Sequence, residues 1–137
     1  MHIGKRNKRE AGQSLVEAAL ALPVIVMLML GLLDFGRAYY ALVSLKDAAD
    51  EGAAYASMNP SDILGIRRRA SEASRQLVPI EPNDVDVIYP PYIHAGASIT
   101  VTTRFALELY TPFANVFVPD NELVLRGQAS HALIAVE

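Results

Sequence analysis

The uncharged stretch AALALPVIVMLMLGLL, residues 18–33, decides the architecture of this 137-residue chain. Leu15 and Val16 extend it if Glu17 is tolerated within an apolar run. As a helix, such a stretch is about 24 to 29 Å long, just enough to cross the hydrocarbon core of a bilayer. It is apolar on all sides, which favours a membrane helix over the buried helix of a soluble domain. We therefore predict a membrane span at about residues 15–33.

The charges on either side of this stretch predict its orientation. Residues 1–12 carry four bases against one acid, and residues 13–137 carry eight bases against fourteen acids. Because bases gather on the cytoplasmic side of a span, we expect a single-pass protein of the cytoplasmic (inner) membrane, with its N-terminus in the cytoplasm and its head outside. The formal net charge of −3 does not indicate a nucleic-acid partner. The chain has no cysteine, which excludes disulfides and thiolate chemistry.

A secretory signal peptide also begins with bases followed by an apolar run, so it is an alternative. The uncharged run is at the upper length limit for a signal peptide, and no small-x-small cleavage site directly follows Leu33. Glu17 is a further argument, because carboxylates inside a membrane segment are usually functional. These features favour a retained helix.

Three motifs lie in the first half of the chain. They are GQSLVE at residues 12–17, GLLDFGR at residues 31–37 and ADEGAAYA at residues 49–56. Together they resemble the TadE-like pilins of tight-adherence (type IVc) pilus systems. The resemblance implies that a prepilin peptidase cuts between Gly12 and Gln13, which makes Glu17 the fifth residue of the mature chain. Ala18 stands where the main tight-adherence pilin has Tyr, which, with the chain length, favours a TadE-like minor pilin or pseudopilin.

The resemblance also implies partners and a role. We expect a subunit involved in filament assembly and surface adhesion, with other pilin subunits, the prepilin peptidase, the pilus assembly platform, its ATPase and membrane lipid as partners. Glu17 would set the register between subunits by pairing with the freed amine of Gln13. Pro23 removes a backbone donor within the span and predicts a kink. The alternative is an uncleaved single-pass membrane-anchored protein with an extracytoplasmic binding domain.

No catalytic motif is found in the sequence. It contains no Gly-x-Ser-x-Gly, no phosphate-binding loop and no His-Glu-x-x-His, and its three histidines are scattered. The triplet DFG at residues 34–36 matches a kinase motif by chance, because the other kinase motifs are missing. Asp34 is instead expected to end the apolar span and to pair with Arg37. We expect no enzymatic activity, no cofactor and no metal.

Beyond the span, apolar residues at spacings of three and four continue the helix to about Met58. The predicted organisation is a basic leader at 1–12, an N-terminal helix at 13–58 and an outward α+β head at 59–137. The expected packing face of this helix consists of Phe35, Ala38, Leu42, Leu45, Ala49, Gly52 and Ala56. A second helix is expected after Asn59, which can cap it, and before Pro79. Its expected packing face consists of Ile63, Ile66, Ala70, Ala73 and Leu77.

After Pro82 the apolar period changes to two, which predicts strands at about 85–89, 99–105 and 123–134. The fold class is therefore α+β, with a long N-terminal transmembrane helix, a short second helix and a small antiparallel three-stranded sheet. We interpret residues 111–118 as a loop that covers the sheet edge or forms a contact surface. The bases at 67–69 predict a solvated face, with lipid headgroups or an acidic neighbouring subunit as alternatives.

Overall fold

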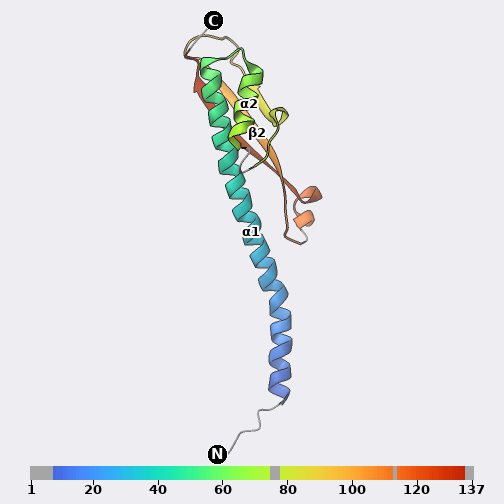
Figure 1. Ribbon diagram of the computed structural model, residues 1–137. Helices are drawn as coiled ribbons and strands as arrows, with labels where there is room; N and C mark the ends of the chain where they lie inside the picture. Colours follow the sequence, from blue (N-terminus) through green and yellow to red (C-terminus); the bar gives the residue numbers. More distant parts are fainter. Residues whose placement is uncertain (1–7, 75–77, 113, 135–137) are drawn as a thin grey trace, which may run out of the picture.

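The computed structural model describes residues 8–74, 78–112 and 114–134, and it confirms the predicted α+β arrangement (Figure 1). A small head, which contains α2 and the sheet, packs beside the C-terminal part of one long helix. The N-terminal part of that helix projects beyond the head. The helices are α1 (Lys8–Met58) and α2 (Ile63–Ser74), the strands are β1 (Val85–Ile88), β2 (Ser98–Glu108) and β3 (Glu122–Ala132), and the short 3-10 turns are η1 (Pro82–Asp84), η2 (Ala114–Val116) and η3 (Pro119–Asn121).

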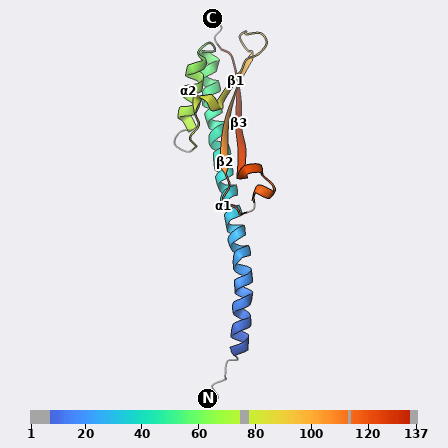
Figure 2. The same ribbon diagram turned by 90° about the vertical axis from the view of Figure 1, so that its right-hand side faces the viewer.

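The three strands form an antiparallel meander in the order β1-β2-β3. Strand β1 pairs with the middle of β2, with Val85 opposite Thr103. Strands β2 and β3 pair along their whole length, from Ser98 opposite Ala132 to Glu108 opposite Glu122. Both helices lie on one face of this sheet (Figure 2). The other face is polar and open, as shown by the exposed hydrogen bond of 2.7 Å between Thr100 and Ser130.

The helix α1 packs on the sheet through small side chains. The face it buries consists of Ala41, Ser44, Leu45, Ala48, Ala49, Gly52, Ala53, Ala56 and Ser57. The predicted face was right from Leu45 onward but wrong at Phe35, which is 69% exposed, and at Leu42, which is 43% exposed, whereas Ala38 is half-buried. Asp34 and Ala41 are buried in their place, each one position earlier in the helix. The large apolar side chains therefore point away from the head, and small ones allow the sheet to approach.

The closest approach is between α1 and the centre of β3. A Cβ atom added to Gly127 would lie 2.6 Å from the backbone nitrogen of Lys46, so no larger residue fits without moving the helix. On β2, the buried hydroxyl of Thr103, the residue opposite Gly127, donates to the carbonyl oxygen of Leu45 at 2.8 Å. A glycine and a hydrogen-bonded threonine thus fix how the helix crosses the sheet.

The cap of the second helix lies three residues later than predicted. Asp62, not Asn59, caps α2, because its carboxylate accepts a 2.9 Å hydrogen bond from the backbone nitrogen of Gly65. Ile66 and Ala70 are buried as predicted, whereas Ile63 and Ala73 are exposed. Gly65, Ser71 and Ser74 are buried as well, since α2 packs closely against α1. The predicted contact of Leu77 lies outside the described residues.

Candidate functional site: the membrane helix and its junction with the head

The residues predicted to act in processing and assembly lie on the part of α1 that projects from the head. Gly12, Gln13, Glu17 and Pro23 are all exposed. The helix begins at Lys8, so the bond between Gly12 and Gln13 lies in its second turn, not ahead of it. Pro23 lies inside the continuous helix. Glu17 forms no ion pair with any other residue that the structure describes.

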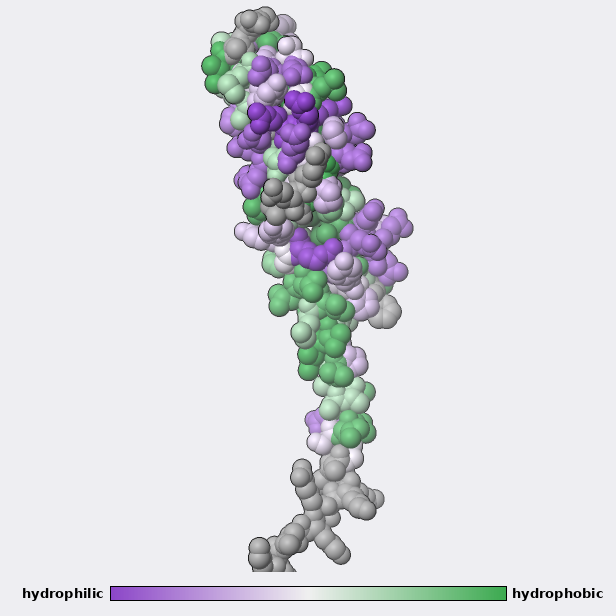
Figure 3. Space-filling view, in the orientation of Figure 1, coloured by the Kyte–Doolittle hydropathy of each residue, from purple (hydrophilic) through white to green (hydrophobic). Residues whose placement is uncertain are grey.

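The projecting part of α1 is apolar around its whole circumference. The helix is long and apolar enough to cross a membrane, and its most apolar 18-residue window has no residue buried against the head. Apolar side chains cover this part of the helix up to the head (Figure 3). Such a surface is unstable in water, at about 25 cal/mol for each Å² exposed, so it requires a bilayer or other apolar helices around it. These properties indicate single-pass membrane anchoring.

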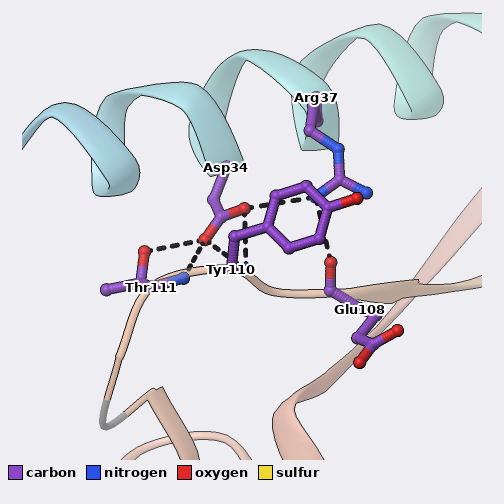
Figure 4. Close-up of polar contacts among 5 residues, drawn as sticks. All are labelled: Asp34, Arg37, Glu108, Tyr110 and Thr111. Atoms are coloured by element: carbon purple, nitrogen blue, oxygen red, sulfur yellow. Dashed lines mark hydrogen bonds and ion pairs between the residues drawn. The ribbon is translucent and has the colours of Figure 1, made fainter.

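At the end of the span, α1 is tied to the turn between β2 and β3. Asp34 directly follows the apolar run, and it is only 5% exposed. Its carboxylate accepts hydrogen bonds from the backbone nitrogen of Tyr110 at 2.9 Å, and from the backbone nitrogen and the hydroxyl of Thr111, both at 2.7 Å (Figure 4). A carboxylate with three such donors is fully satisfied although it is buried.

Arg37, one helical turn after Asp34, also binds the end of β2 at this junction. Its guanidinium donates to Asp34 Oδ1 at 3.3 Å and to the carbonyl oxygen of Glu108 at 3.1 Å. The group also lies over the ring of Tyr110, 4.1 Å from the ring centroid. The predicted pair of Asp34 and Arg37 is thus confirmed, and it belongs to a larger junction that includes the end of β2.

The junction holds Asp34 in its charged form. Burial of the carboxyl raises its pKa, but the hydrogen bonds from Thr111 and Tyr110, together with the charge of Arg37, outweigh this effect. The pKa of Asp34 therefore lies below the ordinary value for aspartate. The negative charge is part of the folded structure at neutral pH.

We did not predict this junction from the sequence, although one local signal was present. Asp34, Ala38, Ala41 and Leu45 recur at helical spacing and lie on one face. This spacing alone is compatible with a buried helix face that includes the carboxylate of Asp34. The partners at residues 108–111 carry no signal of their own, since they contribute mainly backbone groups.

A second group of charges lies where α1 meets α2 and β3. Arg69 pairs with Glu51 at 3.7 Å, and His131 lies 2.9 Å from Asp50. Exposed pairs of this kind contribute little stability. Within the described part of the chain, no three histidine, aspartate or glutamate side chains are grouped so as to hold a metal ion. Part of the basic face at residues 67–69 therefore pairs within the head.

Comparison with known proteins gives a family match in the first half of the chain. No curated protein and no solved structure matches it. The family described as TadE-like protein matches residues 12–54. The match includes Gly12, Glu17 and the pair of Asp34 and Arg37, and it ends before the sheet begins. The predicted resemblance is confirmed over this segment, in which the chain is similar to the TadE-like family.

Proposed function

We propose that this chain is a TadE-like minor pilin, a subunit that takes part in assembling a tight-adherence pilus and in surface adhesion. The observation that carries the proposal is the free apolar half of α1, which bears GQSLVE at its start and lies within the segment matching the TadE-like family. A helix exposed on every side can be surrounded by lipid first and by the helices of other subunits afterwards.

Processing would occur on the cytoplasmic side of the membrane, between Gly12 and Gln13. Gly12 is open, since a Cβ atom added there would meet nothing within 4 Å. The bond lies in the second turn of α1, directly after the four residues whose amides have no partner within the helix, and local opening near a helix end costs little. A prepilin peptidase could therefore bind this segment in an extended form. Cleavage would remove the basic leader and create a new amine at Gln13.

The proposed partners follow from this role. They are other pilin subunits in a homo- or hetero-oligomeric filament, the prepilin peptidase, the assembly platform with its ATPase, and membrane lipid. In this proposal the chain catalyses no reaction itself. Its N-terminus lies in the cytoplasm before cleavage, its span lies in the inner membrane, and its head lies outside the cytoplasm.

The N-terminal residue of the mature protein tests the proposal. Mass spectrometry of the chain from membranes and from sheared surface material should find Gln13 as the first residue. Retention of residues 1–12 in both fractions would favour the uncleaved anchored protein, and a first residue well beyond Leu33 would indicate a secreted protein. A Gly12→Val variant should accumulate uncut, whereas Ala11→Val, one residue earlier, should be cut normally.

Orientation is tested separately by a reporter fused after Glu137. Alkaline phosphatase, which needs export to become active, should be active in this fusion. A reporter that is active only in the cytoplasm, fused at the same place, should be inactive. The reverse pattern in stable fusions would overturn the proposed topology.

A further inference from the structure

We propose that the loop between β2 and β3, described at residues 109–112 and 114–118, is a second membrane contact of this chain. Before assembly, the tip of this loop, which carries the exposed side chains of Val116 and Phe117, would lie in the interfacial zone of the leaflet from which α1 emerges. The head would then rest on the bilayer. The inference rests on the proposed membrane span of α1. It is independent of cleavage and of filament formation.

The junction places this loop at the level of the membrane surface. Tyr110 and Thr111 bond to Asp34, which directly follows Leu33, the last residue of the span. The polar interface extends roughly 5 to 8 Å beyond the hydrocarbon core on each side, which corresponds to about four or five residues of helix. The loop therefore begins within that interface. Figures 1 and 2 both show the loop beside α1 at the end of the head nearest the free helix.

The composition of the loop suits this position. Residues 109–118, LYTPFANVFV, contain no charge, and Glu108 and Asp120 stand on either side. Phe117 is 87% exposed and Val116 is 71% exposed. Large apolar side chains exposed together in this way mark a contact surface. Burial in a headgroup region would remove them from water and would desolvate no charge.

The neighbouring surface of α1 continues the same pattern. Phe35, Tyr39 and Tyr40 are exposed and follow the span directly. Aromatic residues are enriched where membrane helices pass through the interface. The helix and the loop thus present aromatic groups at one level, and Asp34 prevents the loop from moving away.

This continuity favours lipid over a second copy of the chain as the occupant. A contact with another subunit would not require the loop to be tied to the end of the span. The opposite end of the head, formed by the connection between β1 and β2, provides the comparison. There Tyr92 is 82% exposed, and the connection leads into Ser98, at the end of β2 opposite to Glu108 and the junction.

Tryptophan fluorescence can test the contact, because the chain has neither Trp nor Cys. Four single-tryptophan variants of the full chain are placed in nanodiscs at one chain per disc: Phe117→Trp and Val116→Trp in the loop, Tyr92→Trp at the far end and Leu28→Trp within the span. The probes are lipids brominated on the upper part of the acyl chain, and iodide in the aqueous phase. Phe117→Trp tests the loop directly, and Val116→Trp provides a second reporter from the same tip.

We expect Phe117→Trp and Val116→Trp to be quenched by the brominated lipids, as Leu28→Trp is, and Tyr92→Trp not to be. For a side chain inserted 5 to 10 Å, the iodide Stern–Volmer constant should be at least about threefold lower than for Tyr92→Trp. Quenching of Leu28→Trp without quenching of the loop variants would overturn the loop contact and leave the span intact. Shielding from iodide without lipid quenching would indicate a protein contact and would also overturn it. Absence of quenching at Leu28→Trp would remove the span and the loop contact together.

Discussion

The carboxylate of Asp34 and the hydroxyl of Thr111 lie 2.7 Å apart, although 77 positions separate them in the sequence. This contact joins the end of the apolar span to the turn at the end of β2. A head tied at this point cannot pivot freely on the helix, since α1 also packs along the sheet as far as Ser57. Movement of the helix during assembly would therefore be transmitted to the head as a whole.

Replacing Asp34 should loosen this junction and leave the rest of the head folded. Asp34→Asn removes the charge and replaces one carboxylate oxygen by an amide NH₂, so Tyr110 and Thr111 donate to a neutral acceptor and Arg37 loses its anionic partner. Hydrogen bonds to a charged group are worth about 1.5 to 3 kcal/mol, and the opening free energy of the loop should fall by about 2 kcal/mol. Hydrogen exchange measured by mass spectrometry should show faster exchange at residues 109–112 than in the unaltered chain. Asp47→Asn, the same change at an exposed site of α1, should have no effect there.

The junction should also depend on pH in a defined direction. The pKa of Asp34 is lower in the folded chain than the ordinary aspartate pKa of about 3.9. The charged carboxylate therefore contributes its full share to the stability of the junction above that pH, and this contribution is lost as the pH falls through the folded-state pKa. The amide resonances of Tyr110 and Thr111 should shift in this acidic range, with a midpoint below the ordinary value. The amide resonance of Gly65, which donates a hydrogen bond to Asp62, should also shift at low pH as Asp62 is protonated. The pKa of Asp62 is lowered by that hydrogen bond and by the one from Tyr55.

In Asp34→Asn the acidic shift should vanish at Tyr110 and Thr111 and persist at Gly65. A midpoint at or above the ordinary value would mean that the hydrogen bonds do not outweigh burial. The two amide sites thus separate the junction from the helix cap.

The parts of the fold that follow from local periodicity could be predicted from the sequence. The alternation of Ile99, Val101 and Thr103 with polar residues gave the central strand, and the uncharged run gave the long helix. The face of α1 was predicted wrongly at Phe35 and Leu42 because spacings of three and four do not distinguish them from Asp34 and Ala41, which also share a face with Leu45. The sheet instead selects small residues, because α1 must approach Gly127 closely.

The junction at Asp34 could not be derived from local pattern alone. Its partners at Tyr110 and Thr111 donate chiefly through the backbone, which any residue could supply. Only the three-dimensional placement of the β2 end beside the helix gives these groups a role. The predicted Asn59 cap was wrong because residues 59–62 offer more than one capping side chain, and in the structure it is Asp62 that accepts the hydrogen bond from Gly65.

The close crossing of helix and sheet gives a stability prediction. Gly127→Ala would place a methyl group against the backbone of Leu45 and Lys46, which cannot move aside as a side chain would. Such overpacking costs about 1 to 3 kcal/mol, and the helix would have to shift from the sheet. Thermal unfolding of the full chain in detergent should show a lower Tm. Gly36→Ala, on an open part of the same helix, should be neutral or slightly stabilising, and an unchanged Tm for Gly127→Ala would refute the close approach.

The last prediction concerns the acid at the start of the span. Glu17→Ala should insert into the membrane as well as the unaltered chain but should be reduced in filaments. In the proposed topology, Glu17 lies near the cytoplasmic end of the span, so its cost is below the roughly 3 kcal/mol of a charge at the bilayer centre. Within a bundle of subunits it would be desolvated beside the amine of Gln13. Loss of one partner of such a pair leaves the other unpaired, at about 3 to 5 kcal/mol.

The competing explanation is that Glu17 only complements the positive end of the helix dipole, which is worth under about 1 kcal/mol and predicts nearly normal assembly. Quantifying Glu17→Ala in membrane and sheared-filament fractions distinguishes the two. Glu17→Gln keeps the size of the side chain and should show the same defect if charge pairing matters, whereas Ser14→Ala, an exposed polar position one turn earlier, should assemble normally. Unchanged incorporation of Glu17→Ala would refute the register role, and its loss from the membrane fraction would instead indicate a defect in insertion. Cyclisation of Gln13 in filaments would remove the amine, and with it the proposed pair, even when cleavage is normal.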